Sequence, residues 1–378
     1  SISSSKDETY YPRLNRKGDG FYRETGEVRS IAGMDPKRLD QVRQLQEFLH
    51  GADSWSIVII RHGYLMREFY TFNVLVPPDL TSGQDEIIHR DGVESPLDDS
   101  RKNRLPSGQQ IDLDSLAYPY IPEGYPLTDP RKERITNGIY NDEIRHPGEK
   151  MSVIGMPTAT GHGPFESALD DARTDTVNGR QTLSGTRTKW GYGDPVFAHL
   201  PLIFSNVMKQ EMSEHMKERV FDPIGIENLS WDVQGGSGFI GPHTNAHTGI
   251  HVSARELALL LSYVAQRVWN GQRIIPEWRI NLATKTSQDL NPSYGYTWWV
   301  NTKGTCWPNL PRDSFALSGY RSNRCYVIPS LDLVVAHVGS GPPSWDEQTL
   351  IGGIVDSIFI EYKNGNRNNE DYEGHSAF

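Results

Sequence analysis

Strand-forming segments lie near both ends of this chain, and that arrangement limits the folds it can adopt. Residues 54–70, SWSIVIIRHGYLMREFY, have the pattern of two strands joined by a turn at His62-Gly63. Four more short strands are expected late in the chain, in SYGYTWWVNT (293–302), SFALSGY (314–320), NRCYVIPS (323–330) and LDLVVAHVGS (331–340). The sequence therefore predicts an α+β fold, with one sheet built from both chain ends around an inserted, mainly helical region.

Residues 189–226 are expected to contain a turn followed by helices, and three other segments have the signals of single helices. Residues 35–51 begin with Asp-Pro, repeat apolar side chains at helical spacing and end at a glycine. Residues 252–274 form the second expected helix. Ser253 is its expected N-cap and forms a capping-box pattern with Glu256 three residues later. Residues 350–363 are the third expected helix.

The expected domains follow from this order of elements. Residues 1–35 are polar, with scattered glycine and proline, and are expected to form an extended arm. Residues 36–76 and 275–378 are expected to form the α/β sheet domain. Residues 77–274 are expected to form the inserted helical and loop region, which carries active-site elements.

Charge and hydrophobicity exclude some partners. The chain has 38 basic and 48 acidic side chains, a net charge of −10 and no basic cluster, so nucleic acid is not an expected partner. No apolar run approaches the ~20 residues of a membrane span, and the first residues, SISSSKDETYY, have no apolar signal core. These features are compatible with a cytoplasmic protein or a processed secreted or periplasmic one, and they indicate no oligomeric state. The two cysteines, Cys306 and Cys325, are compatible with one disulfide or with two free thiols.

Several phrases spread along roughly two thirds of the chain form an ordered set. They are SIVIIRHGYLMREFY, IDLDSLAYPYIPEGYP, KWGYGDPVFAHL, ERVFDPIGIENLSWD, VSARELALLL with WNGQRIIPEW, and FALSGYRSNRCYVIPSLDLVVAHVG. In order and spacing they resemble the serine β-lactamase and penicillin-binding-protein-like hydrolases, most closely the esterase and 6-aminohexanoate-dimer-hydrolase branch. The resemblance implies a β-lactamase/transpeptidase-like fold with a central antiparallel sheet.

The resemblance also implies acyl transfer without a cofactor, on a small-molecule ester or amide substrate. In such hydrolases a serine attacks the carbonyl, and a lysine one helical turn later, in Ser-x-x-Lys, accepts its proton. A tyrosine from a Tyr-x-Asn loop completes the base network. A late strand with Lys/His-Thr/Ser-Gly supplies a backbone N–H to the oxyanion hole.

The tyrosine loop has a counterpart in Trp190-Gly191-Tyr192-Gly193-Asp194. By resemblance, Tyr192 is the catalytic tyrosine and Trp190 is a wall of the cleft, with Asp194 at the position where asparagine is commoner. The alternative is structural, with Tyr192 packed at a helix N-terminus and Asp194 capping that helix.

The late-strand motif has a counterpart in Ala316-Leu317-Ser318-Gly319-Tyr320. By resemblance, Ser318 hydrogen-bonds the substrate, and Gly319 lets the backbone approach it where a Cβ would obstruct. Tyr320 is expected to line the cleft. Leu317 replaces the expected basic residue, which weakens the case for binding a β-lactam carboxylate by charge. The alternative is an ordinary hairpin glycine.

Three histidines, His243, His247 and His251, lie four residues apart. On a helix they would share a face and could bind zinc. Pro242 and Gly249 flank and interrupt this run, so a helix is not expected there. We therefore predict no metal site, and a loop that brings His251 to the cleft.

The nucleophile motif is not found where the resemblance places it. Ser-x-x-Lys occurs once, as Ser3-Ser4-Ser5-Lys6, in a segment without a helical pattern, and we attribute it to chance. Chain order places the nucleophile helix after the first hairpin, where LTSGQDEIIHRDGVESP holds Ser82, with Asp85 at the position of the lysine. The family helix is buried and apolar, whereas this window is rich in charge. Ser82 is the predicted nucleophile.

Three explanations compete for this window, residues 78–100, and for a second polar window, residues 137–188. The protein is a catalytically inactive member that binds a small ligand or peptide, or Ser82 acts with Tyr192 as base and no lysine. The third explanation is that the natural protein carries residues other than those printed in these windows. We favour the third, because loss of activity usually changes the nucleophile and spares the apolar pattern around it. The predicted function is a serine hydrolase of esters or amides, and the alternative is a binding protein on the same fold.

Overall fold

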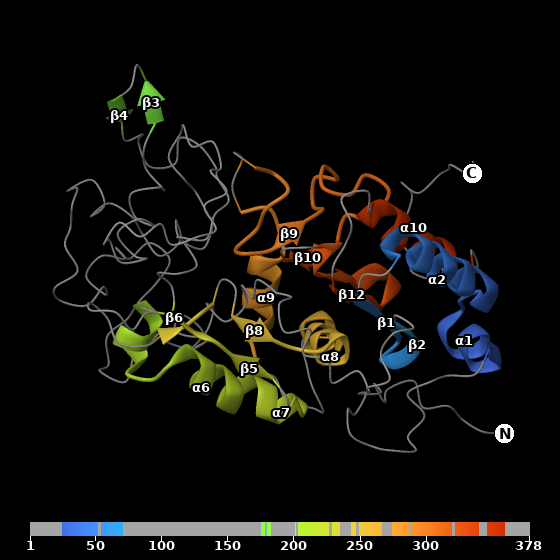
Figure 1. The fold of residues 1–378 in the computed structure, drawn as a ribbon, viewed down its shortest axis with the longest axis horizontal. Helices are drawn as coiled ribbons and strands as arrows, with labels where there is room; N and C mark the ends of the chain where they lie inside the picture. Colours follow the sequence, from blue (N-terminus) through green and yellow to red (C-terminus); the bar gives the residue numbers. More distant parts are fainter. Residues whose placement is uncertain are drawn as a thin grey trace.

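The computed structural model describes residues 25–51, 54–70, 175–177, 180–182, 201, 203–226, 229–234, 243–246, 249–266, 274–287, 289, 291–319, 322–339 and 346–359. These segments include both groups of strands that the sequence predicts. They form a central sheet with helices on both of its faces (Figure 1).

The central sheet has six strands in the order β2-β1-β12-β11-β10-β9, and every neighbouring pair is antiparallel. Its strands are β1 (Trp55–Arg61), β2 (Tyr64–Tyr70), β9 (Trp299–Val300), β10 (Phe315–Ser318), β11 (Arg324–Ile328) and β12 (Leu333–Gly339). β1 pairs with β12 over its whole length, from Trp55 opposite Gly339 to Arg61 opposite Leu333. The predicted sheet from both chain ends is therefore confirmed, although the segment 293–302 contributes only the two residues of β9.

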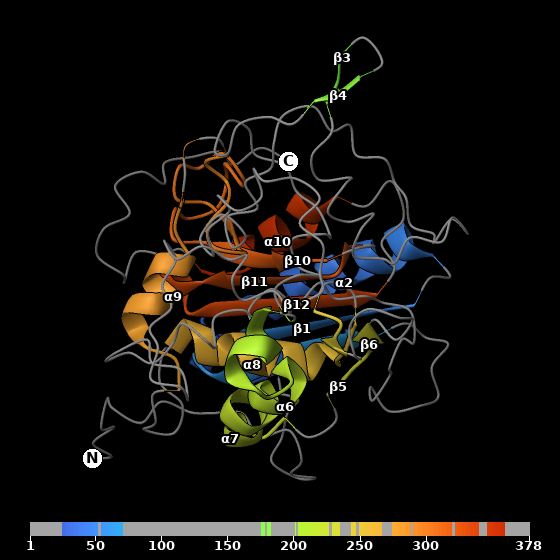
Figure 2. The same ribbon diagram turned by 90° about the vertical axis from the view of Figure 1, so that its left-hand side faces the viewer.

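Both faces of the sheet are buried, because side chains alternate between two apolar cores. Ile57 and Ile59 of β1 join the core formed with α1 (Thr25–Ala32), α2 (Pro36–His50) and α10 (Glu347–Asp356). Val58 and Ile60 join the core formed with α8 (Ala254–Gln266). Figure 2 shows the sheet between α10 and α2 on one side and α8 on the other. Burial on both faces explains why the strands read as nearly continuous apolar runs.

Helix α1 corrects part of the extended arm expected over residues 1–35. Val28, Ala32 and Met34 are fully buried in the core beside α2. Val28 and Ala32 are four residues apart, so a helix places both on one face. Val28 and Ala32 lie in a mainly polar segment of the sequence, so their helical spacing did not predict a helix.

Asp35 caps the N-terminus of α2, as the Asp-Pro start predicts. Its carboxylate accepts a hydrogen bond from the Lys37 N–H at 3.0 Å, and Gly51 ends the helix with a φ of +58°. Asp35→Ala is expected to lower the free energy of unfolding by about 1 kcal/mol, because this bond is lost. Asp40→Ala, at an exposed position within the same helix, is the control and is expected not to destabilise. Urea denaturation measures both variants, and equal losses would contradict the capping role.

Helix α8 begins with the predicted capping box. The Glu256 N–H donates to Ser253 Oγ at 3.2 Å, and the Ser253 N–H donates to Glu256 Oε2 at 3.0 Å. α8 contacts β12, β1 and β11, so a helix assigned to the insert builds part of the sheet's core. α10 begins at Glu347 rather than at residue 350, with Asp346 as its cap, and ends at Asp356.

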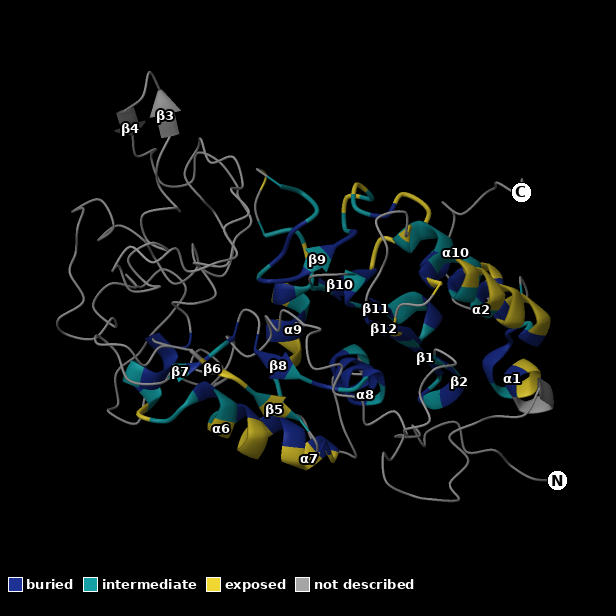
Figure 3. Cartoon of the chain, viewed as in Figure 1, coloured by how far each residue is buried: buried dark blue, intermediate teal, exposed yellow. Residues whose placement is uncertain are grey.

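The remaining elements are short. They are β3 (Asp175–Val177), β4 (Arg180–Thr182), α6 (Met212–Met216), the π-helical turn Lys217–Phe221, α7 (Asp222–Ile224), β5 (Ser230–Trp231), β6 (Val233–Gln234), β7 (His243–Thr244), β8 (Ile250–His251), α9 (Glu277–Ala283) and the 3₁₀ turn Pro329–Leu331. α6 and α7 lie beyond α8 on the side away from the sheet (Figure 2), and exposed residues follow the outer sides of α2 and α7 (Figure 3). Within the described ranges, no helix is long and apolar enough to cross a membrane.

Candidate functional site

Three of the predicted site residues, Ser318, Gly319 and His251, fall in the described part of the chain. Ser318 and Gly319 lie together at the end of β10, whereas His251 lies in β8, which pairs with β5 in a separate small sheet. The other predicted site residues lie outside the described residues, namely Ser82, Trp190, Tyr192, Asp194 and Tyr320. Among the predicted site residues, contacts between neighbouring segments are therefore described mainly at the end of β10.

Side chains along β10 alternate between the two cores. Leu317 is 1% exposed and belongs to the core beside α8. This burial gives a physical reason for a leucine where the resemblance implies a basic residue, because a charge there would be desolvated. Ser318 is half-buried, and its alternation with Leu317 places it on the opposite face.

At the end of β10, the backbone N–H and C=O of Ser318 face away from β11. The Gly319 N–H donates to the Asn323 carbonyl at 2.7 Å, so Gly319 directs its amide toward the β11 side. Successive residues in a strand direct their amides to opposite edges, so the N–H and C=O of Ser318 face the β9 side. The described ladder on that side pairs β9 only with Phe315 and Ala316, and it stops before Ser318. An extended acyl group can add to such an edge as another strand.

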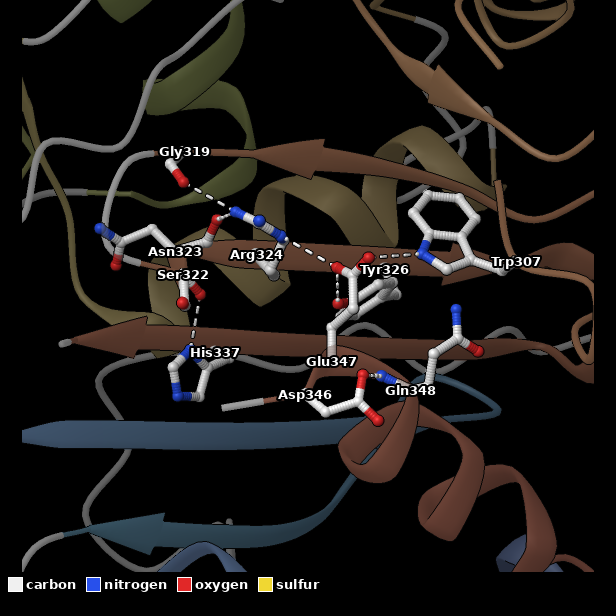
Figure 4. A network of polar contacts seen from close by, with 10 residues as sticks. All are labelled: Trp307, Gly319, Ser322, Asn323, Arg324, Tyr326, His337, Asp346, Glu347 and Gln348. Atoms are coloured by element: carbon white, nitrogen blue, oxygen red, sulfur yellow. Dashed lines mark hydrogen bonds and ion pairs between the residues drawn. The ribbon is translucent and has the colours of Figure 1, made fainter. Parts of the chain in front are cut away.

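Arg324 lies directly opposite Ser318 in the ladder between β10 and β11. Its Nη1 donates to the Gly319 carbonyl at 2.7 Å and to the Asn323 carbonyl at 2.9 Å, and its Nε donates to Glu347 Oε2 at 3.1 Å (Figure 4). We did not predict this contact from the sequence. The only signal was a charged residue directly before the apolar run of β11.

Glu347, the first residue of α10, accepts two further hydrogen bonds. Tyr326 Oη donates to Oε2 at 2.8 Å, and Trp307 Nε1 donates to Oε1 at 3.1 Å. Burial, together with the charge of Glu347, raises the pKa of Tyr326 well above its usual value, so the phenol stays protonated as a donor. The carboxylate thus joins α10 to β11 and to the loop that follows β9.

The two cysteines are both free thiols. Burial, with the nearby charge of Glu347 as a smaller cause, raises the pKa of Cys306 to about 12. Since the thiolate is the reactive form, Cys306 is a poor nucleophile at neutral pH.

Two buried histidines, His337 and His50, lie next to the turn after β10, and His337 contacts it directly. His337 of β12 directs its Nδ1 to the Ser322 carbonyl at 2.8 Å, and its Nε2 lies 3.1 Å from Nε2 of His50. The carbonyl contact requires a proton on Nδ1 of His337. Burial lowers the pKa of His337 to about 3, and the charges of His50 and Arg324 act in the same direction.

This depressed pKa predicts acid lability. An unfolded histidine has a pKa of about 6.5. Below that pH, His337 is therefore protonated in the unfolded chain but stays neutral in the folded protein. The free energy of unfolding should therefore fall from pH 6.5 toward pH 3, by about 1.4 kcal/mol per pH unit from His337 alone. Urea unfolding of wild type and His337→Gln over this range measures the effect. A difference between the two proteins that does not change with pH would contradict it.

Two of the three histidines considered for metal binding, His243 and His251, contact carboxylates. His251 Nε2 lies 3.0 Å from Asp232 Oδ1, and His243 Nδ1 lies 2.8 Å from Glu211 Oε1. His247 lies outside the described residues. In the described ranges, no three His, Cys, Asp or Glu side chains gather closely enough to hold a metal ion. His251 joins β8 to the segment after β5, and no described contact connects it with Ser318.

A protein-family model described as Beta-lactamase matches residues 104–355, about two thirds of the chain. The match begins downstream of the window that holds Ser82. It includes the tyrosine loop, α8 and the strands β9 to β12. A search of curated proteins found no significant match.

Solved structures share the fold at low sequence identity. A protein from Bacillus anthracis assigned as a 6-aminohexanoate-dimer hydrolase is 17% identical with a TM-score of 0.61, over 94% of this chain and 87% of its own. A penicillin-binding-protein homologue from Caulobacter crescentus is 16% identical with a TM-score of 0.60, over 85% of this chain and 98% of its own. A D-stereospecific amidohydrolase from Streptomyces is 13% identical with a TM-score of 0.56, over 83% of this chain and 98% of its own. At these identities the likeness shows the fold alone.

Proposed function

Since the chain belongs to the beta-lactamase family, whose members are generally serine hydrolases, we propose that it hydrolyses a small ester or amide through an acyl-enzyme. The β-lactamase/transpeptidase-like fold of its structural neighbours agrees with this assignment. No cofactor enters the proposed reaction. The rival function is a binding protein that keeps the fold without the chemistry.

The proposed reaction assigns one role to each predicted residue. Ser82 Oγ attacks the substrate carbonyl, and Tyr192, acting as the tyrosinate, accepts the serine proton in place of the lysine that the window lacks. The tetrahedral oxyanion then collapses and expels the alcohol or amine, which takes the proton from Tyr192. Water next attacks the acyl-enzyme and gives a proton to Tyr192, and this proton returns to Ser82 Oγ as the acid leaves. Trp190 and Asp194 flank the tyrosine, and Tyr320 and His251 are proposed to line the substrate side.

The observation that carries this proposal is the end of β10, which in the described part of the chain extends beyond its ladder with β9. Ser318 turns its N–H and C=O to the edge where pairing with β9 has ended at Ala316. In the proposed complex the acyl group of the substrate lies along this edge and hydrogen-bonds to Ser318. Gly319 adds no side chain that could obstruct this approach.

A fluorescent fluorophosphonate and a chromogenic short-chain ester together test the proposal. A serine hydrolase is labelled covalently and releases the chromophore, because both reactions need an activated serine. Labelling together with hydrolysis supports the proposed function. A folded protein that is neither labelled nor active contradicts it and supports the binding role.

A further inference from the structure

The turn that follows β10 is tied together by one guanidinium nitrogen. Nη1 of Arg324 donates to the Gly319 carbonyl at 2.7 Å and to the Asn323 carbonyl at 2.9 Å, on the two arms of the turn. The Gly319 N–H also donates to Asn323 O at 2.7 Å. The carbonyl and the N–H of Gly319 are therefore both held against β11 and the residue before it.

Glu347 orients this guanidinium. Its Oε2 accepts from Arg324 Nε at 3.1 Å, while Tyr326 and Trp307 hold the carboxylate from two other directions (Figure 4). The side chains of Arg324 and Glu347 are only 20% and 30% exposed, so water screens this pair less than an ordinary surface pair. The position of Glu347 in the first turn of α10 also suits a negative charge.

Two further contacts hold the same turn from β12. His337 Nδ1 donates to the Ser322 carbonyl at 2.8 Å, and the Gly339 N–H donates to Asn323 Oδ1 at 2.9 Å. Ser322 adopts a positive φ of +69°, a conformation that a non-glycine residue keeps only where its surroundings enforce it. Contacts from β11 and β12 thus hold the described residues of this turn.

We propose that Arg324, oriented by Glu347, is a positioning residue that aligns the substrate-binding edge of β10. This inference rests on the proposed function, since it gives the arginine a role in that reaction. Arg324 touches no reacting atom. It sets the direction of the β10 backbone at Ser318 and Gly319, where the substrate acyl group is proposed to pair.

Arginine, and not lysine, fits this role. A guanidinium presents several N–H donors in a rigid plane, so Nε can bond Glu347 while Nη1 bonds both carbonyls. A lysine ammonium is a single point on a flexible stem and cannot span the same acceptors.

Arg324→Lys is the first test, with Arg255→Lys as its matched control. Arg255 forms a comparable pair with Glu68 on β2, at the far end of the strand order from β10. Arg324→Lys is expected to lower kcat for the chromogenic ester by about 10- to 100-fold with little change in KM, since small misalignments cost this much. Arg255→Lys is expected to lower the thermal midpoint and leave kcat near wild type.

Chemical rescue separates positioning from general destabilisation. Arg324→Ala is expected to regain a large part of its lost kcat in millimolar guanidinium chloride, because the free cation can occupy the vacated site. Arg255→Ala is expected to show no such gain. Equal kcat in wild type and Arg324→Lys, or equal losses in the Arg324 and Arg255 variants, would overturn the inference alone. A wild-type protein without labelling or hydrolysis would overturn the proposed function and this inference with it.

Discussion

Ser82→Ala is expected to lower the rate of ester hydrolysis by roughly 10⁴-fold or more, and to abolish fluorophosphonate labelling. The proposed acyl-enzyme forms on Oγ of this serine, so its removal leaves no atom for the covalent step. Binding through the β10 edge does not depend on Ser82, so the folded variant should still bind a substrate analogue. Stopped-flow hydrolysis, gel fluorescence and calorimetric binding measure the three quantities.

Ser3→Ala is the matched control for this variant. Ser3 belongs to the chain's single Ser-x-x-Lys sequence, Ser3-Ser4-Ser5-Lys6, which we attribute to chance. The control should be labelled and active like the wild type. Loss of labelling in Ser3→Ala with full labelling in Ser82→Ala would reverse the assignment of the nucleophile.

Tandem mass spectrometry of the labelled wild-type peptide distinguishes the three explanations for the polar windows. A label on Ser82 between its printed neighbours supports catalysis with Tyr192 and without a lysine. A label on a peptide with other residues, in a protein whose map departs from the printed sequence over residues 78–100 and 137–188, supports the explanation that we favour. Intact printed peptides without any label support the inactive binding protein.

The central sheet could be predicted from the sequence because its signals are local. The turn at His62-Gly63 combines two residues that both adopt positive φ, +53° and +75°, as a type I′ hairpin turn requires. The helix starts at Asp35 and Ser253 are likewise contained within a few residues. The joining of both chain ends in one sheet was predicted from the order of the elements, whereas the particular pairing of β1 with β12 was not predicted.

The support of the candidate site could not be predicted because its contacts join distant segments. Glu347 and Arg324 are 23 positions apart. Nothing in the sequence at Arg324 distinguishes a solvated surface charge from a half-buried arginine that bonds two backbone carbonyls. The short apolar pattern of α1 was missed for a related reason, since Val28 and Ala32 gain meaning only from the core that they enter. Local sequence patterns predict individual helices and strands. The contacts of the turn after β10 depend instead on how β11, β12 and α10 pack around it.

Gly339→Ala is expected to lower the free energy of unfolding by roughly 3 kcal/mol or more, by combining backbone strain with overpacking. Gly339 ends β12 with a φ of +127°, and a Cβ added there would lie 2.3 Å from the Ser54 carbonyl oxygen and 2.5 Å from the Trp55 Cα. Both neighbours are backbone atoms, and Trp55 is held opposite Gly339 in the ladder between β1 and β12. The added methyl group can therefore fit only if β1 and β12 separate.

Gly352→Ala is the control with the opposite expected sign. Gly352 lies within α10 and has no atom within 4 Å of an added Cβ, so alanine should stabilise by about 0.5–1 kcal/mol through helix propensity. Urea midpoints measure both variants.

Gly339→Ala should also slow hydrolysis by more than its loss of stability explains. The Gly339 N–H donates to Asn323 Oδ1 at 2.9 Å, and the Asn323 carbonyl accepts from the Gly319 N–H. A stable Gly339→Ala protein would show that β1 and β12 can separate locally, and full activity in it would show that the turn does not need this anchor.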